Sequence, residues 1–158
     1  MADTQTEAEG RGPDASQLIR YRDDETVADP AITVDAFREQ SNAIAVRVEP
    51  GDDVRELVPF LDRLALIEVN FPAFGDGRGY SAARILREEG YTGELRAVGD
   101  VLVDQVAYMR RCGFDAFAPD APLDGDDLTA ALERWPQAYQ SAADMRVPIW
   151  TKRHGTGA

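Results

Sequence analysis

The sequence is poor in the residues that most often hold metals and cofactors. It contains one cysteine, Cys112, and one histidine, His154. A single cysteine excludes an intrachain disulfide, a zinc site built from several thiolates and a four-cysteine iron–sulfur cluster. His154 lies in a polar tail, so we do not expect it to bind a metal, and we expect no metal site. No flavin or nicotinamide fingerprint is evident either, and any cofactor stays unknown.

Lysine and net positive charge are also scarce. Lys152 is the only lysine among 17 basic residues, and 29 acidic residues bring the net charge to -12. Such a charge argues against nucleic acid or an anionic membrane surface as a partner. No apolar stretch approaches the roughly 20 residues that span a bilayer, and the acidic start does not resemble a signal peptide. We therefore expect a cytoplasmic protein.

The chain is long enough for one folded domain. Its 158 residues are 44% hydrophobic, which suits a single core. Residues 1–16 contain almost nothing apolar and are predicted to be a disordered acidic tail. We expect a single α/β domain over residues 17–150 and a second disordered tail over residues 151–158.

Strands and helices alternate along this domain. Four strands are predicted to start near Asn42, Ala65, Glu94 and Phe114, with a short edge strand at residues 17–21 and a last strand at 146–150. Such alternation indicates an open, mostly parallel sheet of four to five strands with helices on both faces. Half a barrel that pairs with a second copy is the alternative, and it would make the protein a homo-oligomer.

A glycine-rich turn at residues 74–81 stands out between a predicted strand at 66–71 and a helix. Three glycines in five residues permit unusual backbone angles, Ser81 suits the N-cap of the helix, and Arg78 adds positive charge. A helix N-terminus with an arginine suits an anion. The spacing matches neither the dinucleotide nor the Walker motif. Asp100 is predicted to cap the helix after the next strand.

Ligands of parallel α/β sheets lie beyond the carboxyl ends of the strands, where an oxyanion such as sulfate, sulfite or phosphate could meet arginines. The candidate binding residues are Asp76, Arg78, Tyr80, Ser81, Arg84, Arg96 and Asp100. Structural roles compete with this interpretation. Arg78 could bind a neighbouring carboxylate, Arg84 and Glu88 form an i,i+4 pair, and Arg96 is the candidate partner of Glu68 in the preceding strand.

Several segments together resemble a known bacterial family. These are residues 74–88, 90–102, 104–105 and 111–117. The sequence is similar over about residues 54–139 to a domain of unknown function encoded beside assimilatory sulfite reductase, often described as a probable oxidoreductase involved in sulfite reduction. The resemblance implies a role in sulfur assimilation and the sulfite reductase system as partner. It supplies no catalytic residue.

Three functions stay open. The leading hypothesis is an accessory protein of sulfite reduction that binds an oxyanion at the glycine turn or contacts the reductase. The second is a Rossmann-like enzyme that acts on a sulfur-pathway metabolite. The third is a scaffold without a small-molecule site, in which the arginines make internal pairs.

Overall fold

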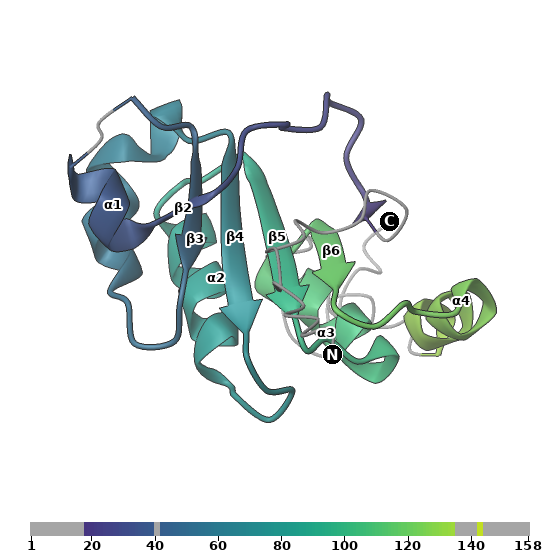
Figure 1. Cartoon of the computed structure of the whole chain (residues 1–158). Helices are drawn as coiled ribbons and strands as arrows, with labels where there is room; N and C mark the ends of the chain where they lie inside the picture. Colours follow the sequence, from purple (N-terminus) through teal and green to yellow (C-terminus); the bar gives the residue numbers. More distant parts are fainter. Residues whose placement is uncertain (1–17, 40–41, 135–141, 144–158) are drawn as a thin grey trace, which may run out of the picture.

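The computed structural model describes residues 18–39, 42–134 and 142–143, which form one open sheet with helices (Figure 1). The predicted tails, the strand predicted at residues 146–150 and the predicted helix end near Trp135 lie outside the described residues. In chain order the elements are β1 (Ile19–Arg20), β2 (Ile32–Thr33), α1 (Val34–Glu39), β3 (Ala45–Val48), the 3₁₀ helix η2 (Val54–Arg63), β4 (Leu66–Phe71), α2 (Arg78–Glu88), β5 (Glu94–Gly99), α3 (Val103–Cys112), β6 (Ala116–Pro119) and α4 (Gly125–Glu133).

The sheet has the order β1-β6-β5-β4-β3-β2. Strands β2 to β6 are parallel neighbours in the order of the chain, and β1 pairs antiparallel with β6. The prediction of an open α/β sheet is confirmed, with six strands among the described residues instead of four or five. The added strand, β2, has two residues, too few to show a hydrophobic period. The sheet is not closed into a barrel, and β1 covers the edge where the parallel series would continue.

The described helices that pack on the sheet do so from one face. Residues 67, 69 and 71 of β4 and residues 95 and 97 of β5 share a core cluster with buried residues of α1, η2, α2 and α3. Successive strands are added in one direction, and right-handed crossovers then return every helix on the same side. The prediction had distributed the helices over both faces. Helices on both faces would have required the strand order to reverse, as it does in doubly wound sheets.

Charged side chains line the opposite face. Side chains alternate between faces along a strand, so Glu68 and Arg96 point away from the helices. Register places Arg47, Glu68, Arg96 and Ala116 in one row across four strands, and Arg20 of β1 opposite Ala116. Glu68, Glu94 and Arg96 are nevertheless buried. Buried charges require partners, and these residues find them in one another.

Helix ends agree with the sequence at some positions and differ at others. Gly113 ends α3 in the left-handed conformation that is common at helix C-termini. The α2 helix begins at Arg78 behind Gly77, so Ser81 lies inside the helix and is not its N-cap. The N-cap of α3 is Leu102 and not Asp100, whose carboxylate binds another segment. Pro59 lies inside η2, and a proline is disfavoured in the interior of an α-helix; the whole segment is a 3₁₀ helix. None of the described helices is long and apolar enough to cross a membrane.

Candidate functional site

The glycine turn joins the carboxyl end of β4 to the first residue of α2. Gly79 is required there because a Cβ atom would lie 2.5 Å from Cζ of the Phe71 ring. The first turn of α2 therefore packs directly on the end of the strand. Gly99, at the end of the neighbouring β5, has φ +95°, and a Cβ there would meet the Phe71 carbonyl oxygen. Two glycines thus let three segments meet at this edge.

Arg78 is bound to the carboxylate of its own turn. Asp76 Oδ1 accepts from the Arg78 backbone N–H at 3.1 Å and from its Nε at 3.0 Å, and Arg78 Nη2 lies 2.6 Å from Oδ2. Hydrogen bonds from the Arg78 side chain, then from its backbone, lower the pKa of Asp76 to about 2. The Asp76 carboxylate is therefore the anion at the start of α2, the position expected for a ligand.

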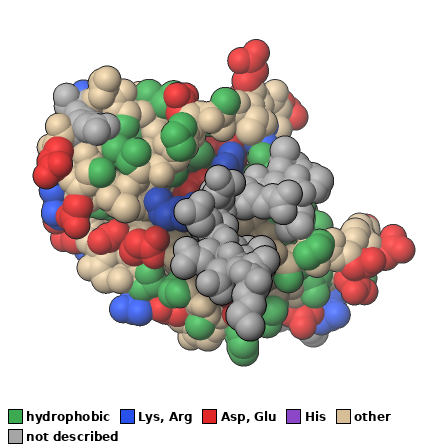
Figure 2. All heavy atoms as spheres, in the orientation of Figure 1, with side chains coloured by type: hydrophobic (Ala, Val, Ile, Leu, Met, Phe, Trp, Pro, Cys, Tyr) green, Lys and Arg blue, Asp and Glu red, His purple; other side chains and the backbone are tan. Residues whose placement is uncertain are grey.

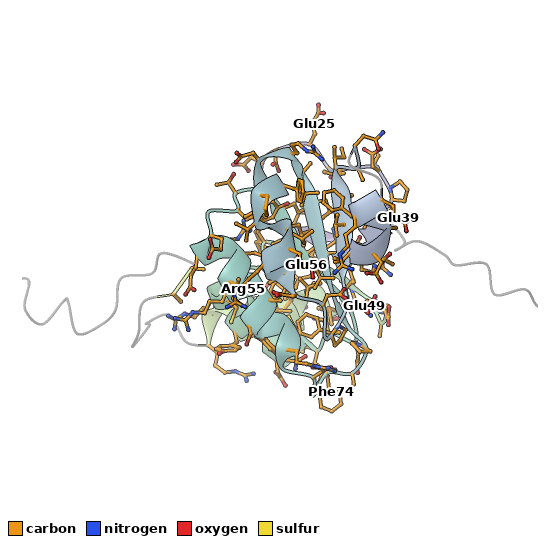
Figure 3. All side chains as sticks on the ribbon, turned by 90° about the vertical axis from the view of Figure 1, so that its left-hand side faces the viewer. Glu25, Glu39, Glu49, Arg55, Glu56 and Phe74 are labelled. Carbon is orange, nitrogen blue, oxygen red and sulfur yellow. The ribbon has the colours of Figure 1, made fainter. Side chains whose placement is uncertain are left out.

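Phe74, at the middle of the same turn, is held by its backbone and exposed by its side chain. Asp100 Oδ2 accepts from the Phe74 N–H at 3.0 Å, and Gln105 Nε2 donates to the Phe74 carbonyl oxygen at 2.8 Å. The side chain is 55% exposed and projects from the end of the molecule (Figure 3). Both polar groups of the peptide backbone at Phe74 are thus satisfied by side chains that follow β5.

Phe74 and the neighbouring parts of α2 and α3 expose apolar side chains, and this set is here called the aromatic edge. The Tyr80 ring lies 5.4 Å from that of Phe71 and 5.3 Å from that of Tyr108, between centroids. Gln105 connects Phe74 to Leu102, because its Oε1 accepts from the Leu102 N–H. The members of the aromatic edge are Phe74, Tyr80, Leu102 and Tyr108.

Large exposed hydrophobic side chains concentrate at this edge. Among the described residues, four such side chains are exposed, and Phe74, Leu102 and Tyr108 are three of them. The fourth, Ile44, lies just before β3, at the amino-terminal ends of the parallel strands. The aromatic edge lies at their carboxyl ends. Exposed aromatic residues that gather in one place are typical of contact surfaces. The sequence analysis had placed Tyr80 among the candidate oxyanion-binding residues and had not considered Tyr108.

The seven residues predicted to bind an oxyanion do not all lie at one site. Arg84 pairs with Glu88 at 2.8 Å on an exposed face of α2, as the i,i+4 alternative predicted. Ser81 is exposed in the first turn of the same helix. Arg96 lies on the charged face of the sheet, with its side chain 6% exposed. Of the seven candidates, Asp76, Arg78, Tyr80, Ser81 and Asp100 gather around the turn.

Arg96 belongs to a chain of ion pairs on the charged face. It lies 3.3 Å from Glu68, as the sequence predicted, and 2.7 Å from Glu94. Glu68 also binds Arg47 at 2.8 Å, and Glu94 binds Arg20 at 2.8 Å. The sequence analysis missed these outer partners. Arg47 could have been found, because it occupies the same alternate position of β3 as Glu68 does of β4.

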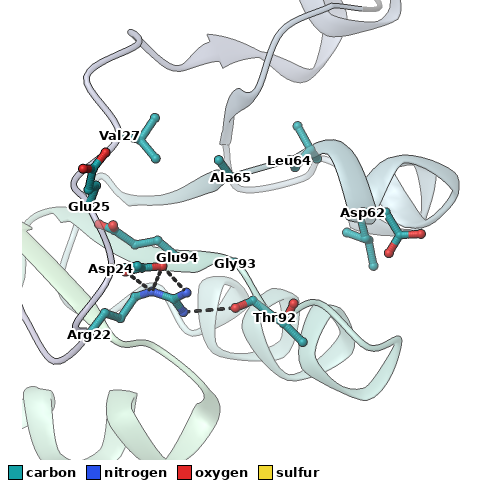
Figure 4. Close-up of a pocket in the computed structure, with 11 residues that line it drawn as sticks. Arg22, Asp24, Glu25, Val27, Asp62, Leu64, Ala65, Thr92, Gly93 and Glu94 are labelled. Atoms are coloured by element: carbon teal, nitrogen blue, oxygen red, sulfur yellow. Dashed lines mark hydrogen bonds and ion pairs between the residues drawn. The ribbon is translucent and has the colours of Figure 1, made fainter.

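A polar pocket of about 310 Å³ lies where β4 and β5 begin, at the opposite end of these strands from the glycine turn (Figure 4). Arg22 crosses it, pairing with Asp24 at 2.6 Å and donating to the Thr92 carbonyl oxygen at 3.1 Å. Its other carboxylates are those of Glu25, Asp62 and Glu94. A smaller pocket of about 40 Å³ at the carboxyl edge is lined by Arg78, Gly79, Asn70 and Glu49. No group of three or more metal-ligating side chains is assembled in the described part of the chain.

The family is decided by one comparison. A model of a family described as a bacterial protein of unknown function, DUF934, matches residues 45–150, more than half of the chain. The chain belongs to this family. The DUF934 match begins at the first residue of β3 and includes the glycine turn, the aromatic edge and the Glu68–Arg96 pair. It also contains the range of the resemblance found in the sequence. Searches of curated proteins and of solved structures found no significant match.

Proposed function

We propose that this DUF934 protein is an accessory protein of assimilatory sulfite reduction that acts by contacting the reductase system through the aromatic edge. The observation that carries the proposal is the exposed Phe74 side chain on a backbone fixed by Asp100 and Gln105. An exposed aromatic residue on a fixed backbone is suited to protein contact, because little conformational entropy is lost on binding. The sulfur-assimilation context comes from the resemblance of the sequence.

Protein contact agrees with the arrangement of the arginines better than oxyanion binding does. Arg78, Arg84 and Arg96 each bind a carboxylate of the chain itself. An incoming oxyanion would have to displace Asp76 from both the Arg78 side chain and the N–H group at the start of α2. It would also meet the net charge of -12. Oxyanion binding is the second candidate function, favoured by the 64% exposure of Arg78 beside the small carboxyl-edge pocket.

The enzyme alternative has less support. A Rossmann-like enzyme binds its ligand where the strand order reverses, and strands β2 to β6 follow one another without reversal. In the described residues the carboxylates nearest the turn, Asp76 and Asp100, are engaged in hydrogen bonds that shape it. A contact protein needs no further catalytic group.

The test measures binding to sulfite reductase from the same organism. Purified protein and reductase are mixed and followed by calorimetry and analytical ultracentrifugation, and sulfate and sulfite are titrated separately into the protein alone. We expect a complex with the reductase and no heat from either anion. Absence of a complex would refute the contact function. Saturable binding of sulfite or sulfate that is lost in Arg78→Ala would establish the second candidate instead.

A further inference from the structure

We propose that Phe74 is the central anchor of the contact surface and inserts into an apolar pocket of a partner whose surrounding surface is basic, with Asp100 and Gln105 as its positioning residues. The inference rests on the proposed function, since the partner tested is sulfite reductase. It adds the residue that makes the contact, the chemistry of the partner and the residues that hold the anchor in place.

The first argument is how the anchor is held. Phe74 lies within a turn closed by the Asp76 N–H, which donates to the Ala73 carbonyl oxygen at 3.0 Å. The two hydrogen bonds between the Phe74 backbone and the side chains of Asp100 and Gln105 add no burial to Phe74, which is 55% exposed. Their effect is to fix the backbone from which the ring projects. Large aromatic side chains held in this way are typical binding hot spots.

The second argument is the surface around the anchor. Leu102 is 41% exposed and Tyr108 is 62% exposed, and both lie on or beside α3, which also supplies Gln105. The Tyr80 and Tyr108 rings are in contact. An aromatic centre with further apolar neighbours matches the anatomy of a protein interface, in which a water-excluding surround strengthens the central contact.

The third argument is charge. The exposed arginines beside the turn, Arg78 and Arg84, are each neutralised by a carboxylate of the chain. Exposed carboxylates gather at the start of α4, where Asp124 is the N-cap and Asp126 and Asp127 follow (Figure 2). Asp120 lies in the loop before α4, and Asp104 of α3 is 3.9 Å from Arg134. An acidic surround selects a basic partner surface and repels a second copy of this chain.

The experiment compares the affinity of sulfite reductase for five forms of the protein. Phe74→Ala should weaken binding by about 30-fold or more, as expected for a hot spot. Ile44→Ala removes the exposed hydrophobic side chain at the amino-terminal ends of the parallel strands and should bind like wild type. Urea unfolding of each variant confirms that it is folded. Equal binding of wild type and Phe74→Ala would overturn the anchor while leaving the proposed contact function intact.

The positioning residues are tested by rescue. Asp100→Ala removes the acceptor for the Phe74 N–H and should weaken binding by about 3- to 10-fold. Without this hydrogen bond the turn is less ordered in the free protein, and ordering it on binding costs conformational entropy. Asp100→Asn keeps an oxygen acceptor and should restore most of that loss. A merely electrostatic role would make the two variants equal, and that result would overturn the positioning role.

Salt and self-association test the partner chemistry. Affinity for the reductase should fall as sodium chloride rises from about 50 to 500 mM, because charge complementarity is screened over this range. An affinity that does not change with salt would overturn the basic partner surface. A wild-type dimer that dissociates in Phe74→Ala, seen by sedimentation, would assign the aromatic edge to a second copy and overturn the proposal. A wild-type protein that does not bind the reductase would refute both this inference and the function on which it rests.

Discussion

Arg78 and Arg96 both bind carboxylates, but in opposite surroundings. Arg78 is 64% exposed and binds Asp76, two residues earlier in the same turn. Arg96 is 6% exposed and joins its own strand, at Glu94, to the neighbouring strand, at Glu68. A local pair at the surface shapes a turn and is well solvated, whereas a buried pair between strands cannot be broken without leaving charge in the interior. The arginine in the conspicuous motif is therefore the less important one for stability.

The largest expected effect is at the buried pair. Arg96→Ala leaves Glu68 and Glu94 buried with one arginine partner fewer each, and we expect it to lower the free energy of unfolding by about 3 kcal/mol. This is the lower end of the range for a broken buried pair, because Arg47 and Arg20 remain. Urea melts measure the change, with Arg84→Ala as the matched exposed control, expected to unfold like wild type. A similar midpoint for both variants would contradict the comparison.

The next effect tests what holds the turn in place. Gly79→Ala puts a methyl group against the Phe71 ring, and overpacking should cost about 1–3 kcal/mol even though alanine is the better helix former. Gly75→Ala is the matched control, since a Cβ at that position meets nothing within 4 Å. The two variants are compared in thermal and urea melts. Equal stability would show that α2 can move away from β4, and that close packing is not what requires glycine.

The smallest effect on stability is expected at Arg78. Arg78→Ala should leave the urea midpoint almost unchanged at neutral pH and raise the pKa of Asp76 from about 2 toward its ordinary value. Part of the depression should persist, because the backbone N–H of residue 78 still donates to Asp76. NMR titration of the Asp76 carboxyl group measures the shift. An unchanged Asp76 pKa would show that the two side chains do not interact in solution.

The same pair has a defined pH dependence. The folded-state pKa of Asp76 lies below that of an unfolded aspartate, so its contribution to stability is present above about pH 4. That contribution is lost as the pH falls toward 2 and the carboxyl group is protonated. The small difference in stability between wild type and Arg78→Ala should therefore disappear at the low end of this range in acid-unfolding curves. Divergence that grows with acidification would reverse the assigned sign.

Sequence reasoning succeeded where the signal was local or lay in adjacent strands. The β4 strand and the Glu68–Arg96 pair were both predicted. A carboxylate inside an apolar strand needs a partner, and the next strand of a parallel sheet is the nearest place to look. The same logic was not carried one strand further, which is why Arg47 was missed.

The failures share a different cause. Ser81 and Asp100 are good capping residues by composition, yet packing of Gly79 on Phe71 starts α2 earlier, and the Asp100 carboxylate binds the Phe74 N–H across the edge. Tertiary contacts override the local preference in both cases. The aromatic edge could not be found in the sequence for the same reason, because only the fold joins the loop of Phe74 to Gln105 and brings the Tyr80 ring to that of Tyr108.

The strand order has a consequence for synthesis at the ribosome. Strands β2 to β6 can be added to the sheet one after another in the order in which they are translated, each beside the strand made before it. The exception is β1, which precedes the other described strands and pairs with residues 116–117 of β6, the last of the described strands to be made. Residues 19–20 must therefore wait without their partner until nearly the whole domain has emerged. The charge pair between Arg20 and Glu94 is available before that pairing, and it gives the waiting segment an earlier attachment to the growing sheet.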